Sequence, residues 1–216
     1  KSSNGIIFLS HHSQKVVSKK IGRYDGEKVI IPHGLSKRFF LQPELRKSDN
    51  SNKVSKLLKI IYVSSVEPYK HQWNVIEAVC SLINKGFSLN LDIVGPSNKR
   101  TLKKLNKSMR KFRNYSNFIK YHGSVEHNQI QQMYKKSDIA VFASSCETFG
   151  QILIEGMASG LPTACSEMSA MPEILGDSGV YFNPLNRNEV KKIASLELEN
   201  LPVIKTDALV DFVLTL

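Results

Sequence analysis

The chain has 216 residues, of which 41% are hydrophobic and 23% charged, a composition typical of a soluble globular protein with one large domain or two small ones. It contains no apolar run long enough to cross a bilayer and no recognisable secretory signal, so no membrane-spanning helix is predicted. The net charge of +11 points to an anionic partner: a nucleotide diphosphate, an anionic membrane surface or a nucleic acid.

The cysteines and histidines give no sign of a metal site. The chain contains three scattered cysteines, Cys80, Cys146 and Cys165. Their odd number and their spacing favour free thiols in a reducing compartment, and we therefore expect a cytoplasmic protein. His11 and His12 are adjacent but have no acidic partner nearby, so we expect no metal there.

The N-terminal part of the chain predicts a small strand–helix–strand unit. The expected strand Gly5–Ser10 is followed by a helix over His11–Gly22 and by a second strand over Lys28–Leu35 that ends in a turn. The polar residues 39–56 are interpreted as a linker, and the chain starts at Lys1 rather than Met, which favours a fragment of a longer protein.

From Leu57 onward, strand and helix patterns alternate. Strands are predicted at 59–63, 89–94, 117–121, 138–142, 161–165 and 179–182, and helices at 71–85, 98–112, 127–136 and 150–159. Strands separated by helices of this length form a parallel sheet with right-handed crossovers. We predict an α/β fold, a Rossmann-like sheet with helices on both faces, over residues 57–186, and a helical tail over residues 187–216.

Polar or glycine residues follow most of these strands. The ends are Ser64-Ser65, Gly95, Gly123 and Ser144-Ser145. Because a parallel sheet places its carboxyl ends at one edge, a nucleotide can lie along that edge. The helix expected from Gly150 would add free N–H groups and a positive dipole end, which suit an anionic or hydroxyl-rich ligand.

Two acids, Glu147 and Glu155, frame this junction and lie eight residues apart. If both face one cleft, their carboxylates can accept charge-assisted hydrogen bonds from sugar or ribose hydroxyls. The equally weighted alternative is that Glu147 only caps the helix and Glu155 is solvated.

Much of the positive charge lies in the predicted helix 98–112. At helical spacing these cations favour a solvated face. No aromatic residues are interleaved with them for base stacking, so we expect no nucleic-acid partner.

The segment from Glu147 to Glu155, with Thr148-Phe149-Gly150 after the first acid and residues 156–162 after the second, resembles the E-x7-E segment of retaining glycosyltransferases with the GT-B fold, of the family 4 type. The turn Ile31-Pro32-His33-Gly34 resembles the family's I-P-N-G turn, with His33 where Asn is usual. The resemblance implies that residues 1–38 are the remnant of an N-terminal acceptor-binding domain, whose remainder is missing, and that residues 57–186 bind the donor.

Residues 62–70 resemble the family's G-R-x-x-x-x-K diphosphate clamp, and Lys70 matches its lysine. An ammonium group there can neutralise the leaving diphosphate as the glycosidic bond breaks. Ser64 and Ser65 replace the Gly-Arg pair, so one cation is missing. This departure implies reduced activity or a different donor.

The resemblance also implies roles for the other site residues. Glu155 would hold the ribose hydroxyls and Glu147 would face the donor sugar. Backbone N–H groups around Phe149, Gly150 and Gln151 would contact sugar hydroxyls or phosphate. Gly95 and Gly123 would let the backbone approach the nucleotide, whereas Glu173 is expected to be structural.

The expected reaction is transfer of a sugar, with retention, from a UDP-sugar or GDP-sugar to a glycan or lipid-linked acceptor, and the fragment alone is expected to be inactive. No cofactor or metal is expected, since no Asp-x-Asp motif occurs. The basic surface is consistent with peripheral contact at the inner face of a membrane and with surface polysaccharide synthesis, such as that of lipopolysaccharide. A nucleotide-sugar epimerase, a non-catalytic nucleotide-sugar-binding module and, third, a basic nucleic-acid binder remain alternatives.

Overall fold

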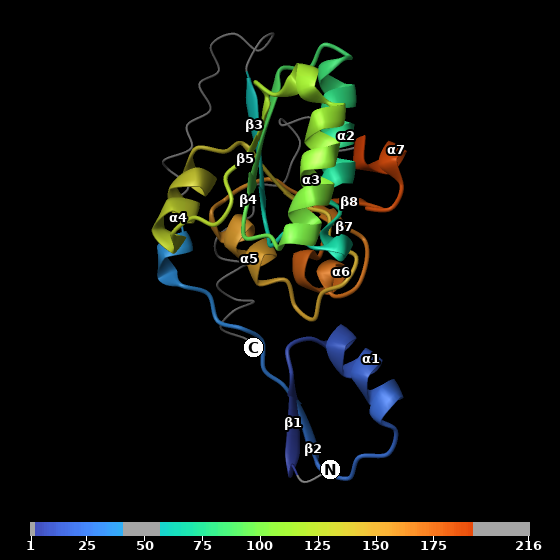
Figure 1. Cartoon of the computed structure of the whole chain (residues 1–216). Helices are drawn as coiled ribbons and strands as arrows, with labels where there is room; N and C mark the ends of the chain where they lie inside the picture. The colour runs from blue at the N-terminus through green and yellow to red at the C-terminus, as the bar shows by residue number, and fades with distance from the viewer. Residues whose placement is uncertain (1–2, 41–56, 192–216) are drawn as a thin grey trace.

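The computed structural model describes residues 3–40 and 57–191. Most of the predicted linker 39–56 and most of the predicted tail 187–216 lie outside these ranges. Figure 1 shows a small N-terminal unit attached to a larger sheet domain, with helix α1 facing α6 of that domain.

The N-terminal unit has the predicted strand–helix–strand order. The parallel strands β1 (Gly5–Phe8) and β2 (Glu27–Ile30) flank α1 (His11–Ile21). The side chain of Ser10 accepts a hydrogen bond from the N–H of Ser13, and the Ser13 hydroxyl accepts one from Ser10 in return. This capping box fixes the start of α1, and Gly22 ends it with a positive φ of 67°.

Within residues 57–191, six strands form one parallel sheet in the order β5-β4-β3-β6-β7-β8. Their bounds are β3 (Leu58–Val63), β4 (Leu89–Val94), β5 (Ile119–Tyr121), β6 (Ile139–Phe142), β7 (Thr163–Ser166) and β8 (Gly179–Phe182). The chain builds outward from β3 in one direction and then returns to place β6 on its other side. A parallel sheet has its ligand crevice at such a switch point, here between β3 and β6.

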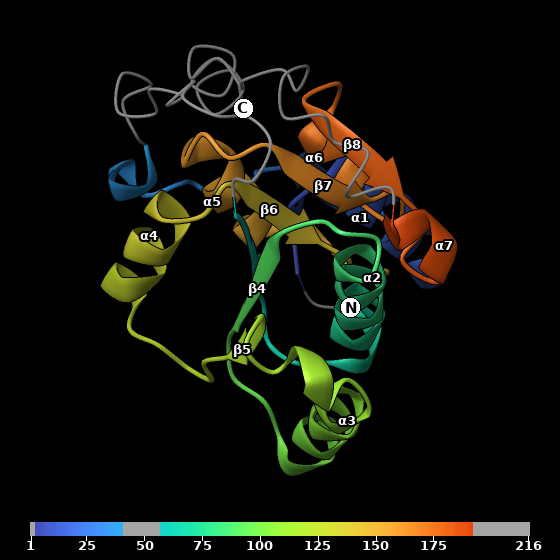
Figure 2. The same cartoon turned by 90° about the horizontal axis from the view of Figure 1, so that it is seen from above.

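The helices of this domain are α2 (Gln72–Ile83), α3 (Lys99–Lys111), α4 (His127–Lys135), α5 (Gln151–Ala158), α6 (Met171–Leu175) and α7 (Arg187–Val190). Seen from above, α2 and α3 lie on one side of β4, and α4 and α5 lie on the other (Figure 2). The predicted Rossmann-like sheet with helices on both faces is therefore confirmed.

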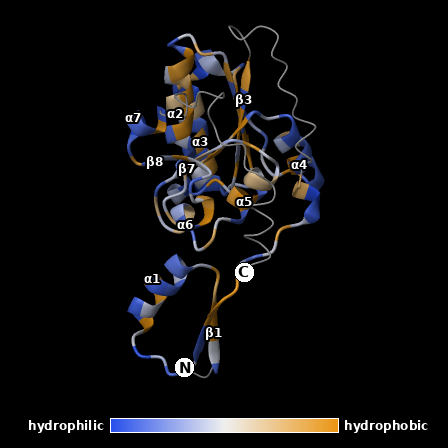
Figure 3. Ribbon diagram, turned by 180° about the vertical axis from the view of Figure 1, so that it is seen from behind, coloured by the Kyte–Doolittle hydropathy of each residue, from blue (hydrophilic) through white to orange (hydrophobic). Residues whose placement is uncertain are grey.

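The core lies along the central strands. All four residues of β6 are buried, as are the last four of β3, because helices cover both faces of a parallel sheet. Figure 3 shows the apolar colour on β3, α2 and α5, whereas α4 and α7 carry mostly the hydrophilic colour. The three cysteines are free, with Cys80 and Cys165 buried and Cys146 exposed.

The bounds of several elements differ from the predicted ones. Helix α5 begins at Gln151 rather than at Gly150, which is a left-handed N-cap with φ 97°. Helix α2 begins at Gln72, after a separate 3-10 turn over Pro68–Lys70. The short helix α6 occupies a segment for which no helix was predicted, and Pro172 lies in its first turn, where a missing N–H costs no hydrogen bond.

Phe39, the first residue of the predicted linker, belongs to the sheet domain by its packing. Its ring is only 2% exposed and makes edge contacts with the rings of His127 and Tyr134 on α4. The segment leaving the N-terminal unit is thus anchored on the core of the larger domain before residue 41.

Candidate active site

The loops after β3, β4 and β5 are held together by backbone hydrogen bonds at the carboxyl edge of the sheet. The N–H of Ser64 donates to the carbonyl of Val94, and the N–H of Gly95 donates to the carbonyl of Gly123, both at 2.8 Å. A Cβ atom on Gly95 would lie 2.1 Å from the Ser64 carbonyl oxygen, and its φ is +138°. Only glycine permits this approach of the two loops.

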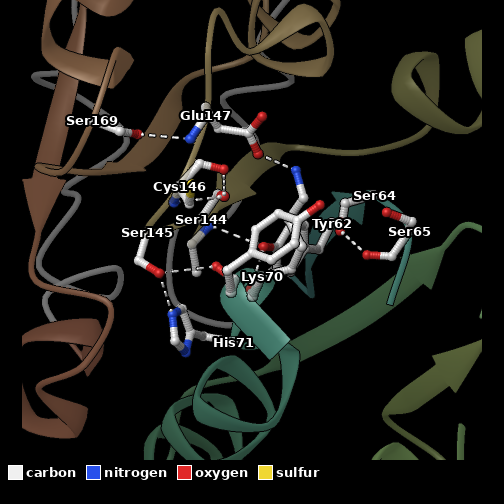
Figure 4. A network of polar contacts seen from close by, with 12 residues as sticks. Tyr62, Ser64, Ser65, Lys70, His71, Ser144, Ser145, Cys146, Glu147 and Ser169 are labelled. Carbon is white, nitrogen blue, oxygen red and sulfur yellow. Dashed lines mark hydrogen bonds and ion pairs between the residues drawn. The ribbon is translucent and has the colours of Figure 1, made fainter. Parts of the chain in front are cut away.

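Tyr62 joins the loop that carries Lys70 to the end of β6 (Figure 4). Its fully buried hydroxyl donates to the carbonyl of Lys70 at 2.5 Å and accepts from the N–H of Ala143 at 3.2 Å. Burial raises the pKa of this hydroxyl, so it stays protonated. The 3-10 turn over Pro68–Lys70 is thereby fixed against the strand that leads to Glu147.

A second link joins the same two loops. The ring Nε2 of His71 lies 2.8 Å from the hydroxyl of Ser145, and the N–H of Ser145 donates to the carbonyl of Tyr69. Burial and the charge of Lys104 lower the pKa of His71, which favours the neutral ring. His71 adopts a left-handed conformation with φ 52°, so its backbone is strained to make this contact.

These links bring Lys70 into a direct ion pair with Glu147, although the two residues are 77 positions apart. The side chains are 9% and 16% exposed, so the pair is largely shielded from water. The Lys70 ammonium also lies 4.9 Å from the ring centroid of Phe142, and the N–H of Glu147 donates to the hydroxyl of Ser169 at 3.0 Å. The structure therefore brings Lys70 and Glu147 together.

Glu155 lies in the second turn of α5 and is only 4% exposed, so the interpretation of a solvated Glu155 is wrong. Its Oε2 is buried and has no hydrogen-bond partner among the described residues. Burial raises the pKa of this carboxyl to about 7. A buried acceptor without a donor is costly, and a ligand with hydroxyl donors would relieve that cost. No hydrogen bond or ion pair of the described residues joins Glu155 to Lys70 or Glu147.

The Ser64-Ser65 turn, which replaces the expected Gly-Arg pair, is held by an amide. The fully buried Gln72 donates from Nε2 to the Ser64 hydroxyl and to the Ser65 carbonyl, both at 2.9 Å. Within residues 3–40 and 57–191, no cation pairs with this turn. The sequence analysis did not identify Gln72. The only sequence signal for its role is its position directly after Lys70-His71.

The N-terminal unit contacts the segment that carries Glu147. The Ser10 hydroxyl donates to the carbonyl of Thr148 at 2.5 Å, and Gln151 donates from Nε2 to the carbonyl of Gly34 at 3.1 Å. The buried ring of Phe149 makes an edge contact with His33, with centroids 5.8 Å apart. The residues that follow Glu147 are therefore tied to the N-terminal unit.

Glu173 on α6 supplies the other contact between the two parts. Its carboxylate accepts hydrogen bonds from the N–H groups of His11 and His12 at 2.7 and 2.9 Å. Burial opposes its ionisation, but these N–H groups and the His11 ring outweigh burial and lower its pKa. Glu173 thus caps the positive end of α1 from the opposite domain.

A groove of about 420 Å³ opens between α1 and the loops after β6 and β7. Its walls include Val16 and Val17 from α1 and Met168 from the loop after β7, and Glu147 lies in its lining. The carboxylate that pairs with Lys70 therefore borders the space between the two parts of the chain. In the part of the chain that the structure describes, no group of three or more His, Cys, Asp or Glu side chains could hold a metal ion.

Residues 44–202, more than half of the chain, match the family described as glycosyl transferases group 1. The chain belongs to this family. Two relatives illustrate how much of this family member aligns with characterised proteins. It is 32% identical over 84 residues to the Escherichia coli O-antigen chain mannosyltransferase B, matching 39% of this chain and 21% of that protein. It is 25% identical over 185 residues to the alpha-monoglucosyldiacylglycerol synthase of Acholeplasma laidlawii, matching 79% of this chain and 44% of that protein.

The chain therefore spans less than half the length of these relatives. Among solved structures, Anabaena HepE in complex with UDP and glucose aligns with a TM-score of 0.80 at 20% identity, over 99% of this chain and 60% of that one. Sucrose-phosphate synthase from Thermosynechococcus elongatus aligns with a TM-score of 0.74 at 19% identity, over 92% of this chain and 50% of that one. The fold is that of the C-terminal half of a GT-B protein, as the sequence resemblance implied.

None of the helices in the described ranges combines the length and apolar character needed to cross a bilayer.

Proposed function

We propose that this family member binds a nucleotide diphosphate sugar at the carboxyl edge of its sheet and transfers the sugar, with retention of configuration, to a glycan or lipid-linked acceptor. The observation that carries the proposal is the shielded contact between Lys70 and Glu147, which lie at the switch point of a parallel sheet and before the N-terminus of α5. In this position the cation suits the diphosphate of the donor, and the carboxylate suits the hydroxyl groups of its sugar.

In this proposal the diphosphate competes with Glu147 for the Lys70 ammonium. Lys70 then neutralises charge on the departing phosphate, with help from the dipole of α5. Glu147, released from the ion pair, accepts hydrogen bonds from hydroxyl groups of the donor sugar. The backbone around Phe149, Gly150 and Gln151 contacts sugar or phosphate, and Gly95 and Gly123 leave space for the nucleoside.

Glu155 would accept hydrogen bonds from the ribose hydroxyls. Its unpartnered buried oxygen supports this role, since hydroxyl donors would satisfy it on binding. The donor is a UDP-sugar or a GDP-sugar, and the solved relatives with UDP and UDP-glucose support the uridine form. The relatives named for an O-antigen chain and for a glucosylated diacylglycerol support a glycan or lipid-linked acceptor.

A nucleotide-sugar-binding module without transfer is the second candidate. It is favoured by Ser64 and Ser65, which offer hydroxyl groups where the family pattern has Gly-Arg, and which the buried amide of Gln72 holds in place. With one cation fewer, the site would hold the diphosphate but stabilise less of its charge during bond cleavage.

Calorimetry with a panel of UDP-sugars and GDP-sugars tests donor binding. We expect Glu155→Ala to abolish binding and Lys70→Ala to weaken it by about tenfold or more, because a charge-assisted contact is lost. Asp177→Ala and Lys135→Ala, which alter exposed residues outside the site, are the matched controls. Binding that both site variants retain at full strength would refute the assignment.

A full-length protein then separates the two candidates. Nucleotide release that requires an added acceptor indicates transfer. Binding of the sugar nucleotide without release, across a set of glycan and lipid-linked acceptors, would favour the binding module instead.

A further inference from the structure

Helix α3 carries a stripe of cations that the fold does not use. Five exposed side chains form this basic stripe: Lys99, Arg100, Lys103, Lys107 and Arg110. At about 100° per residue they fall within about 100° of the helix circumference, on the side away from the buried Thr101 and Leu105. None of the five makes an ion pair with any residue in the described ranges.

The other two cations of α3, Lys104 and Lys111, differ from the stripe because each contacts a neighbouring side chain. The ammonium of Lys104 lies 3.3 Å from the ring centroid of Trp73, and that of Lys111 lies 3.9 Å from Glu77. No acidic residue occurs in the sequence between Lys99 and Phe118. The stripe is therefore a continuous positive surface along a helix about 20 Å long.

This arrangement works against the helix that carries it. Lys99, Lys103 and Lys107 follow one another at i, i+4 spacing, where like charges repel. Lys99 and Arg100 also lie in the first turn of α3, at the positive end of its dipole, and no acid is present there. These unfavourable charge interactions destabilise α3, and an anionic partner would relieve them.

The side chains around the stripe favour a lipid surface over a nucleic acid. The one tryptophan beside it, Trp73, is covered by Lys104, and Phe112 is half-buried against Tyr115, so neither offers a free face for base stacking. Without a free aromatic face for base stacking, the cations of the stripe suit phosphate headgroups better than a nucleic acid.

We propose that the basic stripe of α3 docks the protein on an anionic lipid surface. The charges would meet phosphate headgroups without insertion of the helix, because its apolar side already packs on the core. Figures 1 and 2 show α3 on the outside of the sheet domain, running along it from the carboxyl edge that carries the candidate active site. Docking would therefore leave that edge next to the membrane surface without using its residues.

The test is sedimentation of the full-length protein with vesicles of phosphatidylcholine alone and of an equal mixture of phosphatidylcholine and phosphatidylglycerol. We expect binding only to the mixed vesicles, weakened by salt. The double variant Lys103→Glu/Lys107→Glu should lower the partition coefficient at least about tenfold. The control Lys135→Glu/Lys136→Glu makes the same change in net charge on α4, across the sheet, and should bind nearly as well as the unmodified protein.

Three results would overturn the proposal. They are the absence of binding to the mixed vesicles, equal losses in the stripe and control variants, and preferential binding of an oligonucleotide duplex that vesicles do not displace. Circular dichroism and unchanged nucleotide binding would show that the variants are folded. Because the stripe lies outside the candidate active site, a failure here leaves the proposed transferase function intact, and a failure of donor binding leaves this one intact.

Discussion

At the scale of single residues, Glu155 is the group whose state most affects both stability and binding. In the folded protein its pKa is raised from 4.5 to about 7 by burial. Between these two pH values the folded state binds more protons than the unfolded state, so stability falls as pH rises through this window and is constant above it. Ionised Glu155 thus destabilises the folded protein, and a ligand that donates hydrogen bonds to its carboxylate would offset this destabilisation.

We predict that Glu155→Gln removes this pH dependence. A shift of this size corresponds to about 3 kcal/mol, so the variant should be more stable than the unmodified protein by up to this amount at about pH 8 and nearly equal to it at about pH 4. Urea denaturation across the pH range measures the difference. The same variant should bind nucleotide sugars more weakly at high pH, because an amide is a weaker acceptor than a carboxylate. A variant with the slope of the unmodified protein would show that another group titrates.

At the scale of elements, one hydroxyl connects three pieces of the fold. Tyr62 on β3 bonds to the turn of Lys70 and to the end of β6, and each partner is a buried backbone group that would otherwise lack this bond. The hydroxyl thereby sets how the turn approaches the Glu147 loop. Packing alone does not require it, since a phenylalanine ring would fill the same space.

We predict that Tyr62→Phe costs about 2–3 kcal/mol of unfolding free energy, because it leaves a buried N–H and a buried carbonyl without a partner. It should also weaken binding of the donor, although Tyr62 does not reach the ligand edge itself. Denaturation and calorimetry measure the two effects. Tyr181→Phe, which removes a hydroxyl that bonds to the carbonyl of Gly176 on the exposed side of α6, is the control and should leave donor binding unchanged.

At the scale of the whole molecule, a few polar contacts hold the N-terminal unit on the sheet domain. Glu173 is the main one, since it accepts from two N–H groups at the start of α1. Its pKa is lowered in the folded state, so the stability that it contributes is present above its usual pKa of 4.5 and is lost as pH falls through the folded value.

We predict that Glu173→Ala loosens α1 and lowers the unfolding free energy by about 1–2 kcal/mol at neutral pH, as expected for a lost helix cap. Faster hydrogen exchange over residues 11–21 is the measurement, and Glu173→Gln, which keeps an acceptor, should show an intermediate effect. Unchanged exchange in the alanine variant would mean that the remaining contacts, which include those of Ser10, His33 and Phe39, hold the unit without Glu173.

Much of this protein was determined by the sequence alone, because the signals are local. Alternating apolar runs and helical periodicity predicted the strands, the helices on both faces and the carboxyl edge with Ser64, Gly95, Gly123 and Glu147. Periodicity reports which side of an element is buried, and burial on both faces is what a parallel sheet requires. Short elements were less certain: α6 was missed, since five residues are too few to show a period.

Tertiary structure decided the rest. The sheet order places β6 beside β3, and only this brings Lys70 to Glu147 across 77 residues. Local spacing did not decide whether Glu155 is solvated or faces a ligand, and only the packed structure shows that its carboxyl is buried without a partner among the described residues. The contacts of Tyr62, Gln72 and Glu173 likewise form only when distant segments pack together. These depend on which surfaces meet when distant segments pack, and no local pattern encodes that choice.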